Sequence, residues 1–378
     1  MHIYYLAPYL VSRGWDVHIL SMEGNAPWKF GRIEKRDGYK IYRPSRLTCW
    51  GKLWSSSPFS LETLKYARRF GAIELAKYVK WIALKNDIKI ISAYHIFNAG
   101  FASAIVSREL SIPLVTSVFG EIYSRQKMYQ ERISEVRYVI ENSKKILSCS
   151  KHCARSFETI GLHTDVDTIY YGIDTKQFSD KPSPNIIRQR LGINRDVKIV
   201  LFVARMVVEM GLQVLLDAIP PVLEEEEKVV FMVVGRSGEL LPSANKAALN
   251  YPGKVFVIAD VPLEDLPLYY AASSFVVVPS INARACLGLA IAEAMASKKP
   301  VLVSDIGGGA EVVVNEETGY LFPPNDSKAL CAQIINMLGT EERILLAMGE
   351  QGRKRALTLF DKDETNRKME QVFLGVLQ

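Results

Sequence analysis

Residues that could bind a phosphate group follow two apolar runs in the second half of the chain. Arg205 comes shortly after the run 198–203, and Gly235 and Arg236 follow the run 229–234. A guanidinium pairs with diphosphate oxygens through parallel hydrogen bonds, and a glycine lets the backbone approach a ligand closely. These residues indicate a site for a phosphorylated ligand, although an ordinary surface arginine at a strand end remains the alternative for Arg205.

A single carboxylate lies on an otherwise apolar helix that the sequence predicts over Leu289–Ala296. This helix follows Gly288, and the free amides at a helix start can bind phosphate oxygens. Glu293 lies among aliphatic residues, where a carboxylate is costly unless it accepts hydrogen bonds. Ribose hydroxyls are suitable donors. A local capping or pairing role for Glu293 is the alternative.

Three consecutive glycines follow another predicted strand, in the string Ser304-Asp-Ile-Gly-Gly-Gly-Ala-Glu311. They indicate a tight passage of the backbone. Their spacing is not that of Gly-x-Gly-x-x-Gly, so it does not support a dinucleotide fingerprint.

No metal site is expected from the sequence. The five cysteines are scattered, and Cys149 and Cys153 are not followed by a second pair of ligands at zinc-binding spacing. Asp165 and Asp167 are interpreted as exposed charges before a strand rather than as metal ligands.

Composition excludes several classes of protein. The chain has 378 residues, with 47 Lys and Arg against 41 Asp and Glu, so its net charge is +6. This mild excess fits an anionic ligand but not a nucleic-acid partner. The apolar runs have the length of strands, and the first residues lack a signal-peptide pattern. We therefore expect a cytoplasmic protein with reduced cysteines.

Short apolar runs alternate with longer amphipathic stretches along the whole chain, which is typical of parallel sheets covered by helices on both faces. Predicted strands in the first half are Val17–Ser21, Lys89–Ser92, Pro113–Val118, Lys145–Ser150 and Asp167–Tyr170. Predicted helices there are Ile3–Ser12, Leu61–Lys85, Ala99–Leu110 and Gln126–Asn142.

A second series of elements begins near Val197. Its predicted strands are Lys198–Val203, Val229–Val234, Val255–Ile258, Phe275–Pro279, Pro300–Val303 and Gly319–Phe322. Its predicted helices are Gly211–Glu224, Leu266–Ala271, Leu289–Ala296, Ala310–Val313 and Ser327–Leu338, with a C-terminal helix around Asp363–Leu377. The two series predict an α/β fold of two doubly wound, Rossmann-like domains, joined around Gly172–Pro184. Such sheets bind ligands at the carboxyl ends of their strands, and a cleft between domains is a preferred site.

These residues, taken together, resemble the family-4 retaining glycosyltransferases of the GT-B fold, most strongly from Thr168–Phe178 through Gly319–Pro324. The strings that carry the resemblance are Glu293-Ala-Met-Ala-Ser-Lys-Lys-Pro-Val301, Ser304-Asp-Ile-Gly-Gly308 and Glu317-Thr-Gly-Tyr-Leu-Phe-Pro-Pro-Asn-Asp326. The resemblance extends over nearly the whole chain. It implies an acceptor-side domain over 1–175, a nucleotide-sugar domain over 176–355 and a helix over 356–378 that crosses back to the first domain. It also implies no essential metal or other cofactor, since the nucleotide-diphosphate sugar is a substrate.

The resemblance implies roles for individual residues. Arg205 matches the arginine that binds the diphosphate, and Glu293 matches the second glutamate of an E-x7-E motif, which meets the ribose. Asp260 and Val261 fall in the stretch that lines the base. The complete set of expected donor-binding residues is Gly235, Arg236, Asp260, Val261, Gly288, Leu289 and Glu293.

The chain departs from the family pattern at several positions. Ala285 stands where the first glutamate of E-x7-E belongs, Met210 where a lysine belongs, and Phe119 where many relatives carry a histidine. We expect His95 or Glu121 to contribute in place of that histidine, which makes Arg205, Glu293, His95 and Glu121 the candidate catalytic residues. The family also begins with a strand and a glycine-rich loop, whereas residue 1 here already lies at the first helix, so we expect that strand to be missing.

These observations predict a retaining transferase that moves a hexose from a nucleotide-diphosphate sugar to an acceptor hydroxyl. The acceptor would be a glycan, a lipid-linked molecule or a small molecule. Since Met210 and Ala285 both remove charge from one site, we hypothesise that the activity is weak or lost. A catalytically inactive nucleotide-sugar-binding or partner protein and a nucleotide-sugar epimerase are the alternatives.

A basic and aromatic stretch in the first half suggests a second kind of contact. Thr63–Lys85 mixes lysines and arginines with tyrosine, phenylalanine and tryptophan, and Trp50 and Trp54 precede it. Such a stretch could rest on an anionic membrane, which would make the protein peripherally membrane-associated. A solvated helix with one core face is the alternative.

Overall fold

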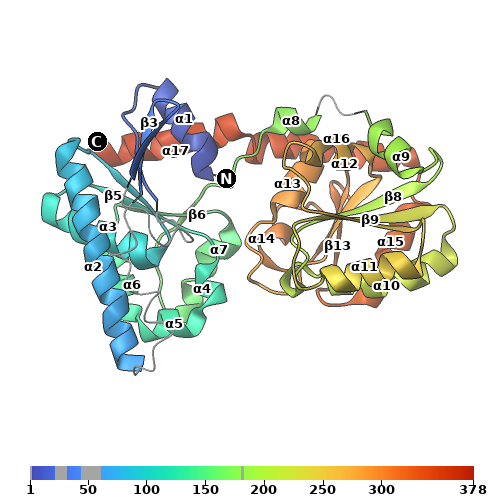
Figure 1. Cartoon of the computed structure of the whole chain (residues 1–378), viewed down its shortest axis with the longest axis horizontal. Coiled ribbons are helices and arrows are strands. Elements are labelled where there is room, and N and C mark those ends of the chain that lie inside the picture. The colour runs from blue at the N-terminus through green and yellow to red at the C-terminus, as the bar shows by residue number, and fades with distance from the viewer. Residues whose placement is uncertain (1, 22–31, 44–60, 180–182) are drawn as a thin grey trace. The chain divides into compact units, whose positions relative to one another are not determined.

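The computed structural model describes residues 2–21, 32–43, 61–179 and 183–378 (Figure 1). The chain divides into two compact units. The first unit comprises Met1–Cys149, Cys153–Ile169 and Thr365–Gln378, and the second comprises Ser150–His152 and Tyr170–Glu364. Trp50 and Trp54 lie outside the described residues.

The first unit contains a four-stranded parallel sheet with the order β4-β5-β6-β7. Its strands are β4 (Ile91–Tyr94), β5 (Leu114–Val118), β6 (Lys145–Ser148) and β7 (Asp167–Thr168). Ile91 pairs with Leu114, so the carboxyl ends of β4 and β5 lie side by side at one edge of the sheet. All four strands confirm predicted runs.

Helices cover both faces of this sheet because successive strand residues point to opposite sides. Leu114 and Val118 pack with helix α3 (Phe101–Leu110) and helix α6 (Ile133–Glu141). Val115, on the other face, packs with helix α1 (His2–Ser12) and helix α17 (Lys362–Leu377). Glu370 of α17 accepts hydrogen bonds from Tyr9 Oη and Trp15 Nε1, both at 3.0 Å, which fixes this helix to the first unit.

The predicted helix Gln126–Asn142 is broken in the structure. It forms α5 (Gln126–Glu131) and α6, with Arg132 between them at φ −116° and ψ 32°. The Arg132 guanidinium lies 4.0 Å from the centre of the Phe97 ring and pairs with Glu135. Local sequence periodicity does not predict these contacts.

A β-hairpin was missed by the sequence analysis. β2 (Arg32–Arg36) pairs antiparallel with β3 (Tyr39–Arg43), and β1 (His18–Leu20) adds parallel to β3. Asp37 and Gly38 form the turn with φ of +46° and +84°. Asp-Gly between apolar–polar alternation is the sequence signal of such a turn.

The remaining helices of the first unit are α2 (Leu61–Lys85), α4 (Glu121–Ser124) and α7 (Lys151–Arg155), whose first residues group with the second unit. Among the described residues no helix is long and apolar enough to cross a membrane.

The second unit is built on a six-stranded parallel sheet with the order β10-β9-β8-β11-β12-β13. The strands are β8 (Lys198–Val203), β9 (Val229–Gly235), β10 (Val255–Ala259), β11 (Phe275–Val278), β12 (Val301–Ser304) and β13 (Gly319–Phe322). All six were predicted. The order reverses between β8 and β11, and ligands bind at the carboxyl ends of strands next to such a reversal.

Each face of this sheet has its own core. Leu201 packs with Tyr270 of α12 (Leu266–Ala272) and Ile291 of α13 (Leu289–Ala296). Phe202, which points the other way, packs with residues of α10 (Leu212–Glu225) and α15 (Ser327–Gly339). The unit also contains α8 (Thr175–Ser179), α9 (Asn185–Leu191), α11 (Leu241–Asn250) and α16 (Glu342–Leu359).

The triple glycine adopts a different structure from the one predicted. The helix expected over Ala310–Val313 is α14 (Gly307–Ala310), which includes the glycines themselves. A Cβ at Gly308 would lie 1.5 Å from the Cys286 carbonyl oxygen, and Gly308 N–H donates to Ala285 O at 3.0 Å. The glycines therefore allow the close backbone passage that the sequence indicated.

Candidate functional site

A cavity of about 380 Å³ opens at the carboxyl ends of β8, β9 and β10 in the second unit. The residues that line it are Val203, Ala204, Gly235, Arg236, Asp260, Val261, Leu263 and Leu266. Four of the expected donor-binding residues therefore come together here, from two loops 25 residues apart in sequence. The cavity combines apolar walls with one cation and one anion, which suits a planar heterocycle with polar edges.

Gly235 makes the close approach of the first two loops possible. Its φ is +143°, and a Cβ there would lie 1.9 Å from the Ala204 carbonyl oxygen. The Gly235 carbonyl also accepts a hydrogen bond from Asp260 N–H at 2.7 Å. This glycine thus joins the loops that follow all three strands.

Asp260 is held in place rather than free to move. Its carboxylate accepts hydrogen bonds from the backbone N–H and the hydroxyl of Ser237. These bonds, with the nearby Arg236 guanidinium, lower the pKa of the Asp260 carboxyl, so it is ionised at neutral pH. Asp260 also has φ +54°, a strained value for a non-glycine residue. Ser237, which sequence reasoning missed, follows Arg236 directly.

Arg205 lies exposed just beyond the end of β8 and is not part of the cavity lining. Its guanidinium has no hydrogen bond or ion pair with any of the residues that the structure describes. An exposed cation without a protein partner at the carboxyl end of a strand is available to an anionic ligand.

Met210 differs in character from the lysine expected there. Its side chain is half-buried and packs against the core formed by α10 and α15. Ala285 likewise lies half-buried in the loop before α13, with its carbonyl bound to Gly308 N–H. Neither position supplies a charge.

Gly288 immediately precedes α13 and has φ +73°. No side chain caps this helix. Ile291 N–H donates to Gly288 O at 2.9 Å, whereas Leu289 N–H and Ala290 N–H have no hydrogen-bond partner among the described residues. Gly288 and Leu289 are not among the residues that line the cavity.

Glu293 is 6% exposed and also lies outside the cavity lining. Its Oε2 accepts a hydrogen bond from the hydroxyl of Tyr270 at 2.8 Å. Burial raises the pKa of the Glu293 carboxyl to about 6, and the bond from Tyr270 opposes that rise. The structure thus shows a local pairing, and a contact with ribose stays a prediction. No sequence signal distinguished Tyr270 from its neighbours.

The other two candidate catalytic residues come together in the first unit. His95 follows β4, and Glu121 begins α4 shortly after β5. His95 Nδ1 lies 3.4 Å from Glu121 Oε1. Phe119 packs edge-on against the His95 ring, with the ring centres 5.0 Å apart.

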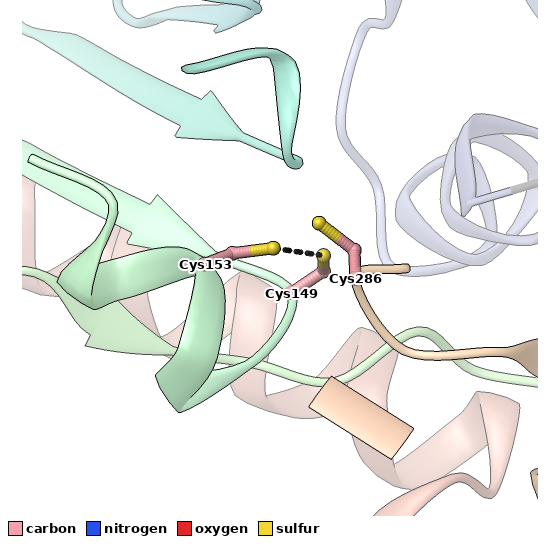
Figure 2. A group of neighbouring side chains, drawn as sticks. All are labelled: Cys149, Cys153 and Cys286. Atoms are coloured by element: carbon pink, nitrogen blue, oxygen red, sulfur yellow. Dashed lines mark hydrogen bonds between the residues drawn. The ribbon is translucent and has the colours of Figure 1, made fainter. Parts of the chain in front are cut away.

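Cys149 and Cys153 are both buried and lie in the first unit. Figure 2 shows Cys149, at the end of β6, donating a hydrogen bond from its thiol to Cys153 on α7, with 3.9 Å between the sulfur atoms. Cys286, also labelled there, lies in the loop before α13. Asp167 pairs with Lys145 Nζ at 2.8 Å across neighbouring strands, which accounts for its charge.

Two doubly wound units, with a cavity at the strand ends of the second, have the architecture of the GT-B fold. Residues 184–355 match the family "Glycosyl transferases group 1", and residues 1–177 match "Glycosyltransferase Family 4". The chain belongs to this type of glycosyltransferase.

Several known proteins are similar to this chain in sequence or in structure. An uncharacterised glycosyltransferase of Methanocaldococcus jannaschii is 24% identical over 75% of this chain and 74% of its own length. Sucrose-phosphate synthase from Thermosynechococcus elongatus has a TM-score of 0.77 at 20% identity, covering 98% of this chain and 91% of that one. HepE of Anabaena, solved with UDP-glucose, has a TM-score of 0.65 at 23% identity, covering 79% and 82%. At these identities the solved structures show the GT-B fold.

Proposed function

We propose that the chain transfers a hexose from a nucleotide-diphosphate sugar to an acceptor hydroxyl with retention of anomeric configuration. One observation carries this proposal. The cavity at the ends of β8–β10 lies in the same strand-end region as Arg205, a guanidinium without a partner among the described residues. That combination suits a base followed by a diphosphate.

The donor-binding roles follow from the chemistry of each residue. Val261, Asp260 and Arg236 would line the base. Arg205 and the amides that begin at Leu289 would neutralise the negative charge that grows on the departing diphosphate, which is the largest electrostatic requirement of this reaction. Glu293 would accept a hydrogen bond from the ribose through Oε1, since Oε2 is bound to Tyr270.

Nucleotide binding is the first test. Titration calorimetry with UDP, GDP and ADP, and with their hexose conjugates, should give a dissociation constant below the millimolar range for one base. Heats that stay flat for the whole panel at millimolar ligand would contradict the proposal. Nuclear magnetic resonance of the sugar product then distinguishes retention from inversion.

We further propose that activity is reduced by Met210 and Ala285, because neither supplies a charge to the donor site. The double variant Met210→Lys, Ala285→Glu should release nucleotide from the donor faster than the parent. An equal rate would show that these two positions do not limit the reaction. If the parent binds nucleotide sugar but shows no turnover, the chain is a binding or partner protein, as the same two positions suggest.

The acceptor and the surface that presents it belong to the same proposal. A glycan, a lipid-linked molecule or a small molecule would supply the hydroxyl. Of the basic stretch Thr63–Lys85, the structure places Lys85 Nζ 4.8 Å from the centre of the Trp81 ring, and Trp81 and Leu84 are 44% and 63% exposed. We propose that this end of α2 contacts an anionic membrane, which sedimentation with phosphatidylglycerol vesicles would test against phosphatidylcholine vesicles.

A further inference from the structure

The cavity at the ends of β8–β10 contains two side chains of opposite charge that do not pair with each other. Of the described residues that line it, Arg236 and Asp260 carry charge, and the others are aliphatic or glycine. The Arg236 guanidinium has no hydrogen bond or ion pair with any residue that the structure describes. A ligand in this cavity therefore meets one group that donates hydrogen bonds and one that accepts them.

Ser237 explains why the two charges stay apart. Its backbone N–H donates to Asp260 Oδ1 at 2.9 Å, and its hydroxyl donates to Oδ2. These bonds lower the pKa of the Asp260 carboxyl, so the group accepts hydrogen bonds and donates none. Each carboxylate oxygen can accept about two bonds, so each keeps a lone pair for a ligand. Ser237 thus fixes the carboxylate and leaves it able to accept from a base.

The backbone of Asp260 is held as firmly as its side chain. Its φ is +54°, and its N–H donates to Gly235 O at 2.7 Å. Strained conformations of this kind concentrate at functional sites. Aspartate and asparagine adopt them more readily than most other residues, so asparagine would suit this backbone equally well. A need for the charge of Asp260 can therefore be separated from a need for its conformation.

The nucleotide bases differ in how well they match such a pair of charged groups. Guanine carries N1–H and the 2-amino group side by side, and the acceptors O6 and N7 follow them along the edge of the ring. A carboxylate can accept from the first pair, and a guanidinium can donate to the second through two parallel bonds. Guanine therefore offers two adjacent donors and two adjacent acceptors in the order that a carboxylate beside a guanidinium requires.

The other bases match the pair less well. Uracil has one N–H between two carbonyl oxygens, so a carboxylate that accepts from it also faces an oxygen. The amino group of adenine lies between two ring nitrogens that are acceptors, so a carboxylate there meets a lone pair. Cytosine has the same conflict, because its amino group lies beside an acceptor nitrogen. Each of these bases leaves one of the two charged groups without a suitable partner.

We propose that the donor is a guanosine-diphosphate sugar, that Asp260 selects guanine and that Ser237 is the positioning residue of Asp260. The inference rests on the proposed function, because it names the base of the donor at the same site. Asp260 accepts hydrogen bonds from N1–H and the 2-amino group, and Arg236 donates to O6 and N7.

A purely structural bond between Ser237 and Asp260 is the competing explanation. Such a bond would hold the loops after β9 and β10 in place, and losing it would weaken the binding of every nucleotide to the same degree. Selection of guanine instead affects nucleotides according to the groups on their bases. The two explanations are therefore distinguished by ratios of dissociation constants.

The first experiment is calorimetry of the full chain with GDP, inosine diphosphate, UDP and ADP. GDP should bind most tightly. Inosine diphosphate lacks the 2-amino group and should bind about 10-fold more weakly, the usual effect of losing a hydrogen bond to a charged group. Tighter binding of UDP or ADP, or equal binding of GDP and inosine diphosphate, would overturn the selection of guanine and leave the transferase intact. Flat heats for all four would contradict the proposed function as well.

The second experiment reverses the preference. In Asp260→Asn an amide NH₂ opposes the 2-amino group of guanine, so GDP should bind about 10-fold more weakly than to the parent. Xanthosine diphosphate has an oxygen in place of that amino group and should bind more tightly to D260N than to the parent. Asp217→Asn is the matched control, because Asp217 also accepts a side-chain bond, from Gln213 at 2.8 Å, but lies outside this cavity. An unchanged preference in D260N, or equal weakening for every nucleotide, would overturn the proposal.

The third experiment tests the positioning role. Ser237→Ala removes the hydroxyl bond to Asp260 and keeps the backbone bond. The preference for GDP over inosine diphosphate should fall several-fold while the dissociation constant of UDP stays the same. Ser237→Thr keeps a hydroxyl and should restore the preference. Equal losses for all nucleotides in S237A, or no restoration by S237T, would show that Ser237 does not position Asp260 for guanine.

Discussion

At the scale of single residues, Arg205 has the most direct test. Arg205→Ala should weaken binding of the nucleoside diphosphate about 10- to 100-fold, the usual effect of losing hydrogen bonds to a charged group. Binding of the corresponding nucleoside should change little, because the base cavity does not include Arg205. Calorimetry measures both constants. Arg195→Ala, another exposed arginine of the second unit, is the control and should leave both unchanged.

Glu293 makes stability depend on pH. Its pKa is about 6 in the folded chain against 4.5 as the ordinary value. Because the folded state holds this proton more tightly, the stabilisation is complete below pH 4.5 and is lost as the pH rises through 6. The rise corresponds to about 2 kcal/mol.

Glu293→Gln should remove this dependence, because an amide can accept the bond from Tyr270 without carrying a charge. Relative to the parent, the variant should gain about 2 kcal/mol of stability between pH 4.5 and pH 7.5. Thermal unfolding at the two pH values measures the gain. Glu264→Gln, on an exposed residue of the same unit, should show none, and a pH-independent difference for E293Q would contradict the assignment.

At the scale of elements, Gly235 decides whether the loops after β8 and β9 can approach. Gly235→Ala should lower the melting temperature and abolish nucleotide binding, because the new Cβ meets Ala204 O at 1.9 Å. Gly253→Ala is a matched control, since Gly253 also has a positive φ, +74°, but nothing lies within 4 Å of the added Cβ. That control should cost only about 1 kcal/mol from backbone strain and keep binding. Equal effects of the two variants would show that the positive φ of Gly235, and not its close approach to the Ala204 carbonyl, explains why a glycine is needed there.

Elements also show where local pattern and tertiary contact compete. The six strands of the second unit are predominantly apolar because the sheet is buried on both faces. This pattern allowed them to be predicted from the sequence. The break in the predicted helix at Arg132 could not be predicted from the sequence, because the Phe97 ring that the Arg132 guanidinium covers is 35 residues away.

At the scale of the whole molecule, the second unit should fold by itself. Both of its cores consist entirely of residues between Tyr170 and Glu364. A chain of residues 170–364 should therefore show a cooperative thermal transition and bind the same nucleotide as the full protein. A fragment without such a transition would contradict the independence of the unit.

The first unit should behave differently, since its core is not continuous in sequence. Met369 and Phe373 of α17 pack with Leu6 and Leu10 of α1. A chain of residues 1–169 lacks these side chains. It should melt at a lower temperature than a chain in which residues 1–169 are covalently extended by the α17 segment. Circular dichroism measures both transitions, and equal melting temperatures would contradict the role of α17.

The sequence by itself determined the α/β class, the strands of the four-stranded and six-stranded parallel sheets, and four of the residues that line the cavity. It could do so because buried parallel strands are apolar throughout, and because parallel topology brings their carboxyl ends, with Gly235, Arg236, Asp260 and Val261, to one edge. Only the tertiary structure decided which side chains bond to which. The Tyr270 bond to Glu293, the Ser237 bonds to Asp260 and the approach of His95 to Glu121 all depend on strand register and loop conformation, for which a single sequence contains no periodic signal.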